Sequence, residues 1–429
     1  MSQMLEEILS DENIKDAVKR VKSNKGVGGV DDIQLEDLEA YMVQNWRHIA
    51  EQIRTRTYRP QPVLRVEIPK PNGGVRKLGI PTLVDRIIEQ AITQVLTPIF
   101  EPLFHENSYG FRPNRRCEQA IVKLLELFND GYEWIVDIDL EKFFDNVPQD
   151  KLMSLVGRVI KDGDTESLIR KYLKAGVMNK GKYESTEVGT PQGGNLSPLL
   201  SNIMLNELDM ELGRRGLNFT RYADDVVIVV KSEAAAKRVM QSIIKWIERR
   251  LDLKVNATKT QVTRPRKLKY LGFAFSKDKT ENKWIAIPHK TSIERLKLKL
   301  KSLCKRNWSI ELTKRLTKIN SVARGWINYF RICRMKEHME KIDGHLRTLI
   351  RVIIWKQWKT ASKREWGLLK LKVKPWLAHK TANWGNHYQF VATKSVLKRA
   401  VSKEILTKRG LVSLLDYYLE RQVAMTSSI

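Results

Sequence analysis

The chain has 429 residues and a mass of 49.9 kDa, which exceeds one ordinary domain and fits two or three. Hydrophobic residues make up 42% and charged residues 29%, a mixture that excludes a mainly disordered chain. The longest aliphatic run, residues 226–230, is far too short to span a membrane. The N-terminus lacks the basic start and apolar core of a signal peptide, so the sequence predicts a cytoplasmic protein without a membrane partner.

The charge is distributed unevenly along the chain. Residues 1–263 contain 38 Lys and Arg against 38 Asp and Glu, whereas residues 264–429 contain 39 against 11, so the whole net charge of +28 lies in the C-terminal part. Such a segment repels itself unless a polyanion neutralises it. Nucleic acid is the favoured partner; an anionic membrane is a weaker alternative, because no lipidation motif or basic amphipathic end is present.

The three cysteines, Cys117, Cys304 and Cys333, are too few and too scattered for a disulfide framework or a zinc site. Reduced, buried thiols are therefore expected.

The hydrophobic pattern changes along the chain. Residues 1–60 predict helices interrupted by a glycine-containing loop at 24–31. From 61 to about 275, short apolar runs alternate with helical segments, which is typical of a mixed α/β or α+β domain. Residues 134–139, 219–222 and 226–230 each predict a strand, and the last two form a hairpin. From 289 to 429, apolar residues recur at helical spacing.

Carboxylates occupy positions where strands usually carry apolar residues. Asp137 and Asp139 are two apart in one predicted strand and project from the same face. Asp224 and Asp225 lie at the tip of the predicted hairpin. Clustered carboxylates repel each other unless cations neutralise them, and Mg²⁺ is the usual solution; a pair of ions catalyses phosphoryl transfer in polymerases. The alternative is that Asp224 and Asp225 only form a turn and the other two face solvent on an edge strand.

Several segments together resemble a known family. Tyr222-Ala223-Asp224-Asp225 resembles the catalytic hairpin of reverse transcriptases, and the segment from Asp139 to Asp145 resembles the first metal-binding strand of the same palm. Four further segments resemble other reverse transcriptase blocks in the family's order: residues 69–76, 108–113, 189–194 and 269–273. Residues 324–330 and 355–359 resemble the thumb, or maturase, region of group II intron-encoded proteins, and residues 24–31 resemble that family's N-terminal block. The family's longer members end in a Cys/His-containing endonuclease domain, and the sequence to Ile429 lacks those cysteines, so the resemblance is to a compact type without it.

The resemblance implies an α+β fold: a right-hand polymerase whose fingers and palm surround an antiparallel palm sheet. An α-helical thumb and a small basic C-terminal region would follow. The implied domains are an N-terminal extension with the first reverse transcriptase block (1–60), fingers and palm (61–288), a thumb or maturase domain (289–365) and a basic DNA-binding region (366–429). The implied partners are an RNA template, a DNA primer, the RNA–DNA hybrid, deoxynucleotides (dNTPs) and a group II intron RNA.

The resemblance also implies roles for single residues. Asp139 and Asp224 would hold two Mg²⁺ ions (or Mn²⁺), with Asp225 as a weaker ligand, and Asp137 would be structural. The Phe144 ring would exclude the 2′-hydroxyl of a ribonucleotide, while neighbouring Phe143 fits the core better. Substrate contacts would also come from four further side chains: Lys70 and Arg76 on the triphosphate, Gln192 in a glycine-bearing loop, and Arg112 on the template or nucleotide.

The leading hypothesis is thus an RNA-directed DNA polymerase that also assists intron splicing and retrohoming. Two alternatives remain open at this point: a host-adapted polymerase of the same fold acting in DNA repair, and an RNA-binding splicing cofactor with little polymerase activity. The intact aspartates disfavour the second alternative. An RNA-directed RNA polymerase shares the paired acids, but Phe144 argues against it.

Overall fold

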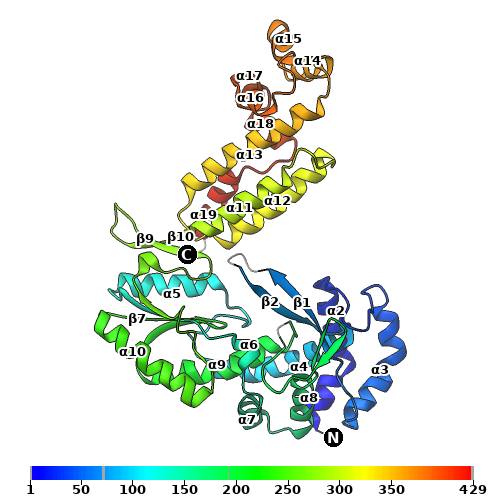
Figure 1. The fold of residues 1–429 in the computed structure, drawn as a ribbon, viewed down its shortest axis with the longest axis vertical. Helices are drawn as coiled ribbons and strands as arrows, with labels where there is room; N and C mark the ends of the chain where they lie inside the picture. The colour runs from blue at the N-terminus through cyan, green and yellow to red at the C-terminus, as the bar shows by residue number, and fades with distance from the viewer. Residues whose placement is uncertain (1, 70–72, 192, 427–429) are drawn as a thin grey trace. The chain divides into compact units, whose positions relative to one another are not determined.

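The computed structural model describes residues 2–69, 73–191 and 193–426, which form two compact units, 1–264 and 265–429. The N-terminal unit contains two four-stranded sheets, and the C-terminal unit contains a two-stranded hairpin and helices (Figure 1). This division falls earlier than the boundary expected after residue 288, because the hairpin groups with the helices that follow it. Among the described residues, no helix combines the length and apolarity needed to cross a bilayer.

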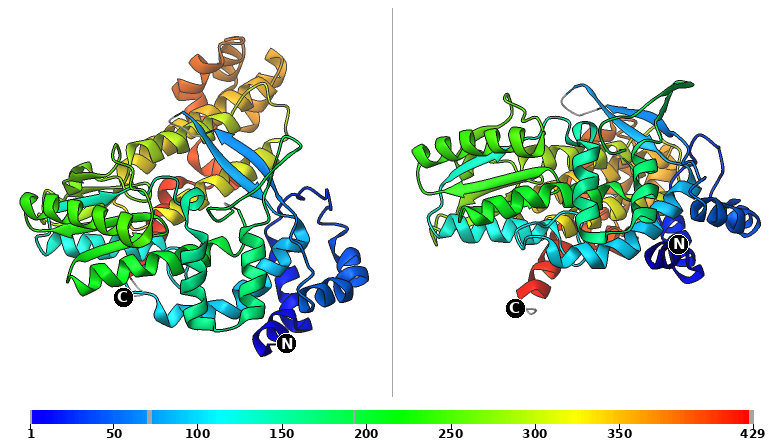
Figure 2. Two further views of the ribbon diagram at one scale, coloured as in Figure 1. Left: turned by 60° about the horizontal axis from the view of Figure 1, so that its bottom comes forward. Right: turned by 90° about the horizontal axis from the view of Figure 1, so that it is seen from below.

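The N-terminal unit begins with three helices, and a loop separates the second from the third, as predicted. Ser10 and Thr82 cap α2 and α4 by accepting hydrogen bonds from backbone N–H groups. The dark-blue N-terminal helices lie together at one end of this unit (Figure 2). The α-helices of the unit are α1 (Gln3–Leu9), α2 (Asp11–Ser23), α3 (Leu38–Arg54), α4 (Leu83–Phe100), α5 (Cys117–Asn129), α6 (Phe143–Asn146), α7 (Gln149–Ile160), α8 (Gly163–Leu173), α9 (Ser197–Arg214) and α10 (Glu233–Trp246).

The two sheets of this unit differ in topology. One has the order β2-β1-β4-β5, with β1 and β4 parallel, and comprises β1 (Val63–Pro69), β2 (Val75–Ile80), β4 (Val177–Asn179) and β5 (Lys182–Glu184). The other has the order β6-β7-β3-β8, and every neighbouring pair in it is antiparallel. Its strands are β3 (Trp134–Ile138), β6 (Asn218–Tyr222), β7 (Asp225–Val230) and β8 (Gln261–Thr263). The predicted antiparallel palm sheet and its three predicted strands are confirmed.

Helices cover the palm sheet on both sides. Helix α10 packs against β3, β7 and β8, while α5 and α9 pack against β6, and Figure 1 shows α5 and α10 on opposite sides of β7. This explains why residues 226–230 are an unbroken apolar run: every one of them is buried, whereas a half-exposed strand would alternate. The carboxylates at the end of this strand are thus attached to a rigid core.

The C-terminal unit is helical apart from the hairpin of β9 (Phe273–Lys277) and β10 (Trp284–Pro288). Its thiols Cys304 and Cys333 are buried as expected, and burial raises the pKa of Cys304 to about 11, while Cys117 in the N-terminal unit is only half-buried. Its helices are α11 (Lys290–Leu303), α12 (Leu312–Tyr329), α13 (Lys336–Gln357), α14 (Ala361–Lys370), α15 (Pro375–Ala382), α16 (Tyr388–Thr393), α17 (Ser395–Ala400), α18 (Lys403–Lys408) and α19 (Leu414–Thr426).

The last third of this unit packs on the helices before it. Helix α19 lies against α12 and α13, and α16 lies against α13. Trp355 is fully buried, and its indole N–H donates to the Gly385 carbonyl at 3.0 Å. The described residues from 366 to 426 therefore share a core with the preceding helices and do not form a detachable tail.

Candidate active site

The hairpin of β6 and β7 carries Asp224 and Asp225 at its tip. Tyr222 pairs with Asp225, which leaves Ala223 and Asp224 as a two-residue loop. Ala223 has a φ of 56°, in the left-handed region, where a bulky side chain would be strained. The turn is also closely covered, because a Cβ atom at Gly110 would lie 2.3 Å from the Ala223 nitrogen. Gly110 thus lets the segment before α5 pack directly on the turn.

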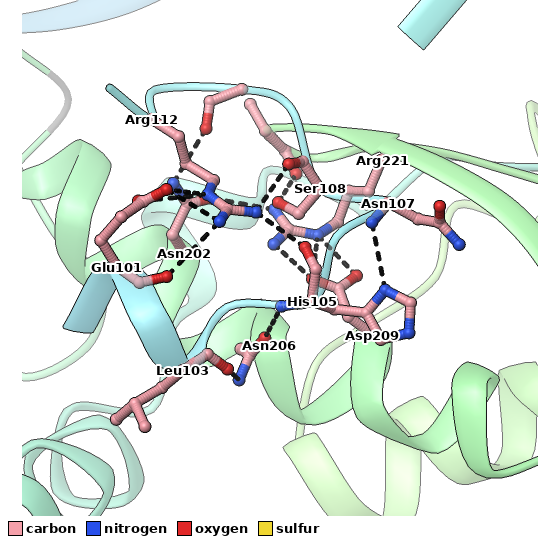
Figure 3. A network of polar contacts seen from close by, with 12 residues as sticks. Glu101, Leu103, His105, Asn107, Ser108, Arg112, Asn202, Asn206, Asp209 and Arg221 are labelled. Atoms are coloured by element: carbon pink, nitrogen blue, oxygen red, sulfur yellow. Dashed lines mark hydrogen bonds and ion pairs between the residues drawn. The ribbon is translucent and has the colours of Figure 1, made fainter. Parts of the chain in front are cut away.

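A buried ion pair next to this turn holds it in place, and Figure 3 shows its two side chains, Arg221 and Asp209. Arg221 on β6 and Asp209 on α9 are both fully buried, with Arg221 Nη2 at 2.6 Å from Asp209 Oδ2. Arg221 Nη1 also donates to the Ala223 carbonyl at 2.9 Å and to Asn202 Oδ1 at 3.0 Å. The amide of Asn202 in turn donates to the Gly110 carbonyl. One guanidinium therefore connects helix α9, the turn and the segment that covers it.

Arg112, expected to contact template or nucleotide, is bonded to partners within the N-terminal unit. Its guanidinium is buried and pairs with Glu101 at 2.8 Å. It also donates to the backbone carbonyls of His105 and Ser108 at 2.7 and 2.9 Å (Figure 3). These bonds use the donors that a substrate contact would need. Arg112 thus shapes the loop whose Gly110 covers the turn, and a contact of Arg112 with template or nucleotide stays a prediction.

The strand register brings Asp139 next to the turn. In the antiparallel pair of β3 and β7, Ile138 lies opposite Val226 and Asp137 opposite Val227, so Asp139 and Asp225 follow at the adjoining strand ends. Residues opposite each other in an antiparallel pair project from the same face, which places Asp137, Asp139 and Asp225 on one face. Lys259 Nζ lies 3.3 Å from Asp139 Oδ2. The three predicted catalytic carboxylates therefore converge at one end of the palm sheet.

These carboxylates also act on one another electrostatically. Burial and then the charges of Asp224, Asp137 and Asp139 raise the pKa of Asp225 to about 7. Burial and the charge of Asp139 also raise the pKa of Asp224, while the Arg76 and Arg221 charges lower it. The pKa of Asp137 is raised mainly by burial and partly by Asp139. Like charges held this close favour neutralisation by protons or metal cations.

The donor set suits a hard divalent cation, although it is not assembled as a ligating cluster. Carboxylate oxygens are the ligands that Mg²⁺ takes in polymerase sites, together with substrate phosphates. Within the three described stretches of chain, no group of three or more His, Cys, Asp or Glu side chains is placed to hold a metal ion. The structure thus places several carboxylates close together at the turn, and their oxygen atoms are of the kind that binds Mg²⁺.

Phe144 is the second residue of α6, five positions after Asp139, and its backbone is bonded to the glycine-bearing loop that follows β5. Its ring is half-exposed and packs edge-on against the buried Phe143. The Thr190 N–H donates to the Phe144 carbonyl at 2.7 Å, so the loop is bonded to the backbone that carries the ring. Phe143 belongs to the core, as expected, whereas Phe144 is half-exposed and its contact with the nucleotide stays a prediction.

The same loop approaches the predicted fingers hairpin of β1 and β2. A Cβ atom at Gly193 would lie 2.1 Å from the Gly79 carbonyl of β2, so only glycine permits this approach. Arg76 on β2 is exposed, and its charge acts on Asp224. Lys70 and Gln192 lie outside the described residues. Arg76, Phe144 and the three aspartates therefore belong to one region of the N-terminal unit.

The sequence did not predict the buried polar residues that hold this region in place. Glu89 on α4 is buried, and its carboxylate accepts the Asn195 N–H at 2.5 Å, which holds the 189–194 loop at the start of α9. Burial raises the pKa of Glu89 to about 8. Arg221, Asp209 and Asn202 were missed as well. Charged residues inside apolar segments were the only available signal for Glu89 and Arg221.

Comparison with known proteins defines the class to which this geometry belongs. Residues 68–275 match the family described as reverse transcriptase (RNA-dependent DNA polymerase). Residues 293–372 match the maturase-specific domain of group II introns. The carboxylate-bearing hairpin is therefore part of a reverse transcriptase domain, and a maturase domain follows it along the chain.

Individual relatives agree with this assignment. Protein YkfC of Escherichia coli (strain K12) is 33% identical over 302 residues, which cover 61% of this chain and 79% of YkfC. The group II intron-encoded protein LtrA of Lactococcus lactis subsp. cremoris is 37% identical over 209 residues, covering 48% of this chain and 34% of LtrA. The Retron Ec86 reverse transcriptase of Escherichia coli is 30% identical over 155 residues, covering 35% of this chain and 44% of its own.

The chain belongs to the group II intron-encoded reverse transcriptases and maturases, a family of RNA-directed DNA polymerases. Its aligned part is only about a third of LtrA.

Proposed function

We propose that this chain synthesises DNA on an RNA template by nucleotidyl transfer from dNTPs. The observation that supports this most is the convergence of Asp139, Asp224 and Asp225 at the ends of β3 and β7, inside a reverse transcriptase domain. We assign Asp139 and Asp224 to hold two Mg²⁺ ions, with Asp225 as an auxiliary ligand. Bound there, the ions would activate the primer hydroxyl and stabilise the leaving pyrophosphate. Primer extension on RNA and on DNA templates, with dNTPs and NTPs in parallel, tests this assignment.

Residues around the carboxylates would bind the incoming nucleotide. Arg76 is exposed on β2 and acts electrostatically on Asp224, a location that suits a triphosphate contact. We assign Lys70 and Gln192 to the same substrate from their sequence positions alone. Arg112 stays a predicted contact of the template or nucleotide, although Glu101 and backbone carbonyls bond its guanidinium.

Replacing Phe144 with Ala is expected to weaken discrimination against ribonucleotides by about 10- to 100-fold, because the ring would no longer exclude a 2′-hydroxyl. The ratio of kcat/KM for dNTP and NTP incorporation on one RNA template measures this. Phe143→Leu is the matched control: it alters the buried neighbour and should lower stability while leaving the ratio unchanged. Equal ratios in the wild type and Phe144→Ala would contradict the role of the ring.

The maturase domain supports a second activity on intron RNA. Residues 293–372 match this domain, and residues 264–429 carry the whole excess of positive charge. We propose that this part binds the structured RNA of a group II intron and assists its splicing and retrohoming. In this proposal 1–60 is an N-terminal extension, 61–288 the fingers and palm, 289–365 the thumb, and 366–429 a DNA-binding region. Splicing of a group II intron RNA with and without the protein tests the RNA role.

Substitution of basic residues in this region tests its contact with nucleic acid. A truncation would also remove α19, which packs on α12 and α13. Lys374 and Lys380, at the start of α15 and within it, are both exposed. Lys374→Ala with Lys380→Ala is expected to lower the slope of log K against log salt by about 1 to 2 for duplex binding, as fewer phosphates are neutralised. Arg238→Ala with Lys245→Ala on α10 removes the same charge from the N-terminal unit and is the control. An unchanged slope in the first variant would show that this surface does not contact the backbone of the nucleic acid.

A further inference from the structure

The N-terminal unit, residues 1–264, has 39 basic and 38 acidic residues, yet half of the residues that line one of its cavities are basic. The cavity has a volume of about 770 Å³ and lies between α7, the C-terminal half of α9 and the π-helical turn η2 (Ile247–Leu251) that ends α10. Two acids, Glu207 and Glu211, also line it. Its basic lining residues are Lys151, Arg158, Arg214, Arg215, Arg249 and Arg250.

Two of these cations are held in place by the protein. Glu211 accepts from Arg214 Nε at 2.8 Å and from Arg215 Nε at 2.7 Å, and Arg215 Nη1 also donates to Ser242 Oγ at 2.7 Å. The side-chain bonds from Arg214 and Arg215 lower the pKa of Glu211 to about 2, so this acid stays charged. Arg214 and Arg215 are thus oriented toward the cavity by one carboxylate that they share.

Among the described residues, the other four cations, Lys151, Arg158, Arg249 and Arg250, have no side-chain hydrogen bond or ion pair. Arg158 lines the cavity from α7, and Arg249 and Arg250 line it from η2; all three residues are exposed. Unpaired cations gathered around one cavity repel each other and attract a polyanion.

The kind of anion follows from the elements that form the cavity. Compact polyphosphates are usually held by backbone N–H groups at helix N-termini or in glycine-rich loops. Here Arg214, Arg249 and Arg250 belong to C-terminal turns, where the helix dipole is negative and no backbone donors are free. Contacts must therefore come from side chains around an open rim, which is how proteins follow the phosphates of a nucleic-acid strand.

We propose that this cavity is a second nucleic-acid contact, which binds successive backbone phosphates of a single strand away from the catalytic carboxylates. Helix α9 separates the two regions: it begins just after the loop bonded to Phe144 and ends at Arg214, and 18 residues of helix span roughly 27 Å. A strand held there lies outside the polymerase site. The assignment does not depend on the polymerase activity proposed above.

Charge reversal with Arg249→Glu and Arg250→Glu in the full-length protein tests the site. The probes are a short RNA–DNA primer–template and the same duplex with a 30-nucleotide single-stranded RNA extension. The variant is expected to bind the extended probe about ten-fold more weakly, with a salt slope shallower by about 1 to 2. Its affinity for the short probe and its extension rate on it should stay within about two-fold of wild type. Arg158→Glu, on α7, should weaken binding of the extended probe in the same way.

Arg238→Glu with Lys245→Glu is the matched control: it reverses the same number of exposed charges on α10 without lining the cavity. An equal loss in this control would reduce the effect to net charge and overturn the site. Unchanged binding of the extended probe by both cavity variants would also overturn it, and would leave the arginines as complements of helix ends. Competition with inorganic tripolyphosphate distinguishes the source of the phosphates: displacement of the extension at micromolar concentration would assign the cavity to a free polyphosphate instead of a strand.

Discussion

Asp224→Ala is expected to reduce dNTP incorporation on a primed RNA template by at least about a thousand-fold, while RNA affinity stays within about two-fold. The reason is that Asp224 lies in the two-residue loop beside Asp139 and Asp225, where loss of one ligand removes several kcal/mol of charge stabilisation from the transition state. Single-turnover incorporation with Mg²⁺ measures the rate, and equilibrium binding of the same primer–template measures the affinity.

Asp137→Asn is the matched control for this result. Asp137 lies on the same face of β3, one pleat before Asp139, and its pKa is also raised by burial. Because it is set back from the turn, its amide variant should keep at least about a third of the wild-type rate. Full polymerisation by Asp224→Ala would remove the catalytic assignment, and a loss in Asp137→Asn as large as in Asp224→Ala would extend the catalytic group to Asp137.

Arg221→Met should lower the free energy of unfolding of the N-terminal unit by about 3–5 kcal/mol, since it leaves the fully buried Asp209 without its partner. Incorporation should fall as well, because the Ala223 carbonyl loses the donor that fixes the turn. Urea unfolding followed by circular dichroism measures the first effect, and primer extension at a temperature where the variant is folded measures the second.

A double variant separates these two effects. Arg221→Met with Asp209→Leu removes both buried charges and should recover most of the lost stability. It does not restore the bond to the Ala223 carbonyl, so its incorporation rate should remain low. Recovery of stability and activity together would mean that Arg221 acts only through stability and does not position the turn.

The sequence predicted those elements of this protein in which apolar residues recur at a regular spacing. Apolar residues at strand and helical spacing located β3, β6, β7 and the C-terminal helices, and paired acids at a hairpin tip located the carboxylates. Such periodicity reports which face a side chain takes, because the backbone geometry fixes it locally.

Burial of charged residues could not be predicted in the same way. Arg112 and Arg76 are the same residue type in neighbouring motifs, yet Arg112 is enclosed by Glu101 and backbone carbonyls while Arg76 is exposed. The partner that decides between these outcomes comes from another element of the fold. For the same reason the sequence did not identify Glu89, or the pairing of Arg221 with Asp209.

The anchoring of the catalytic turn has a consequence for the order of events during biosynthesis. The turn depends at once on Gly110, on Asn202 and Asp209 of α9, and on Arg221. A nascent chain that has emerged only as far as α9 carries Asp139 but has no turn. A chain whose α9 has not docked leaves Ala223 without its anchor. We therefore expect polymerase activity to appear only when the whole palm has folded. Incompletely folded intermediates should not copy RNA.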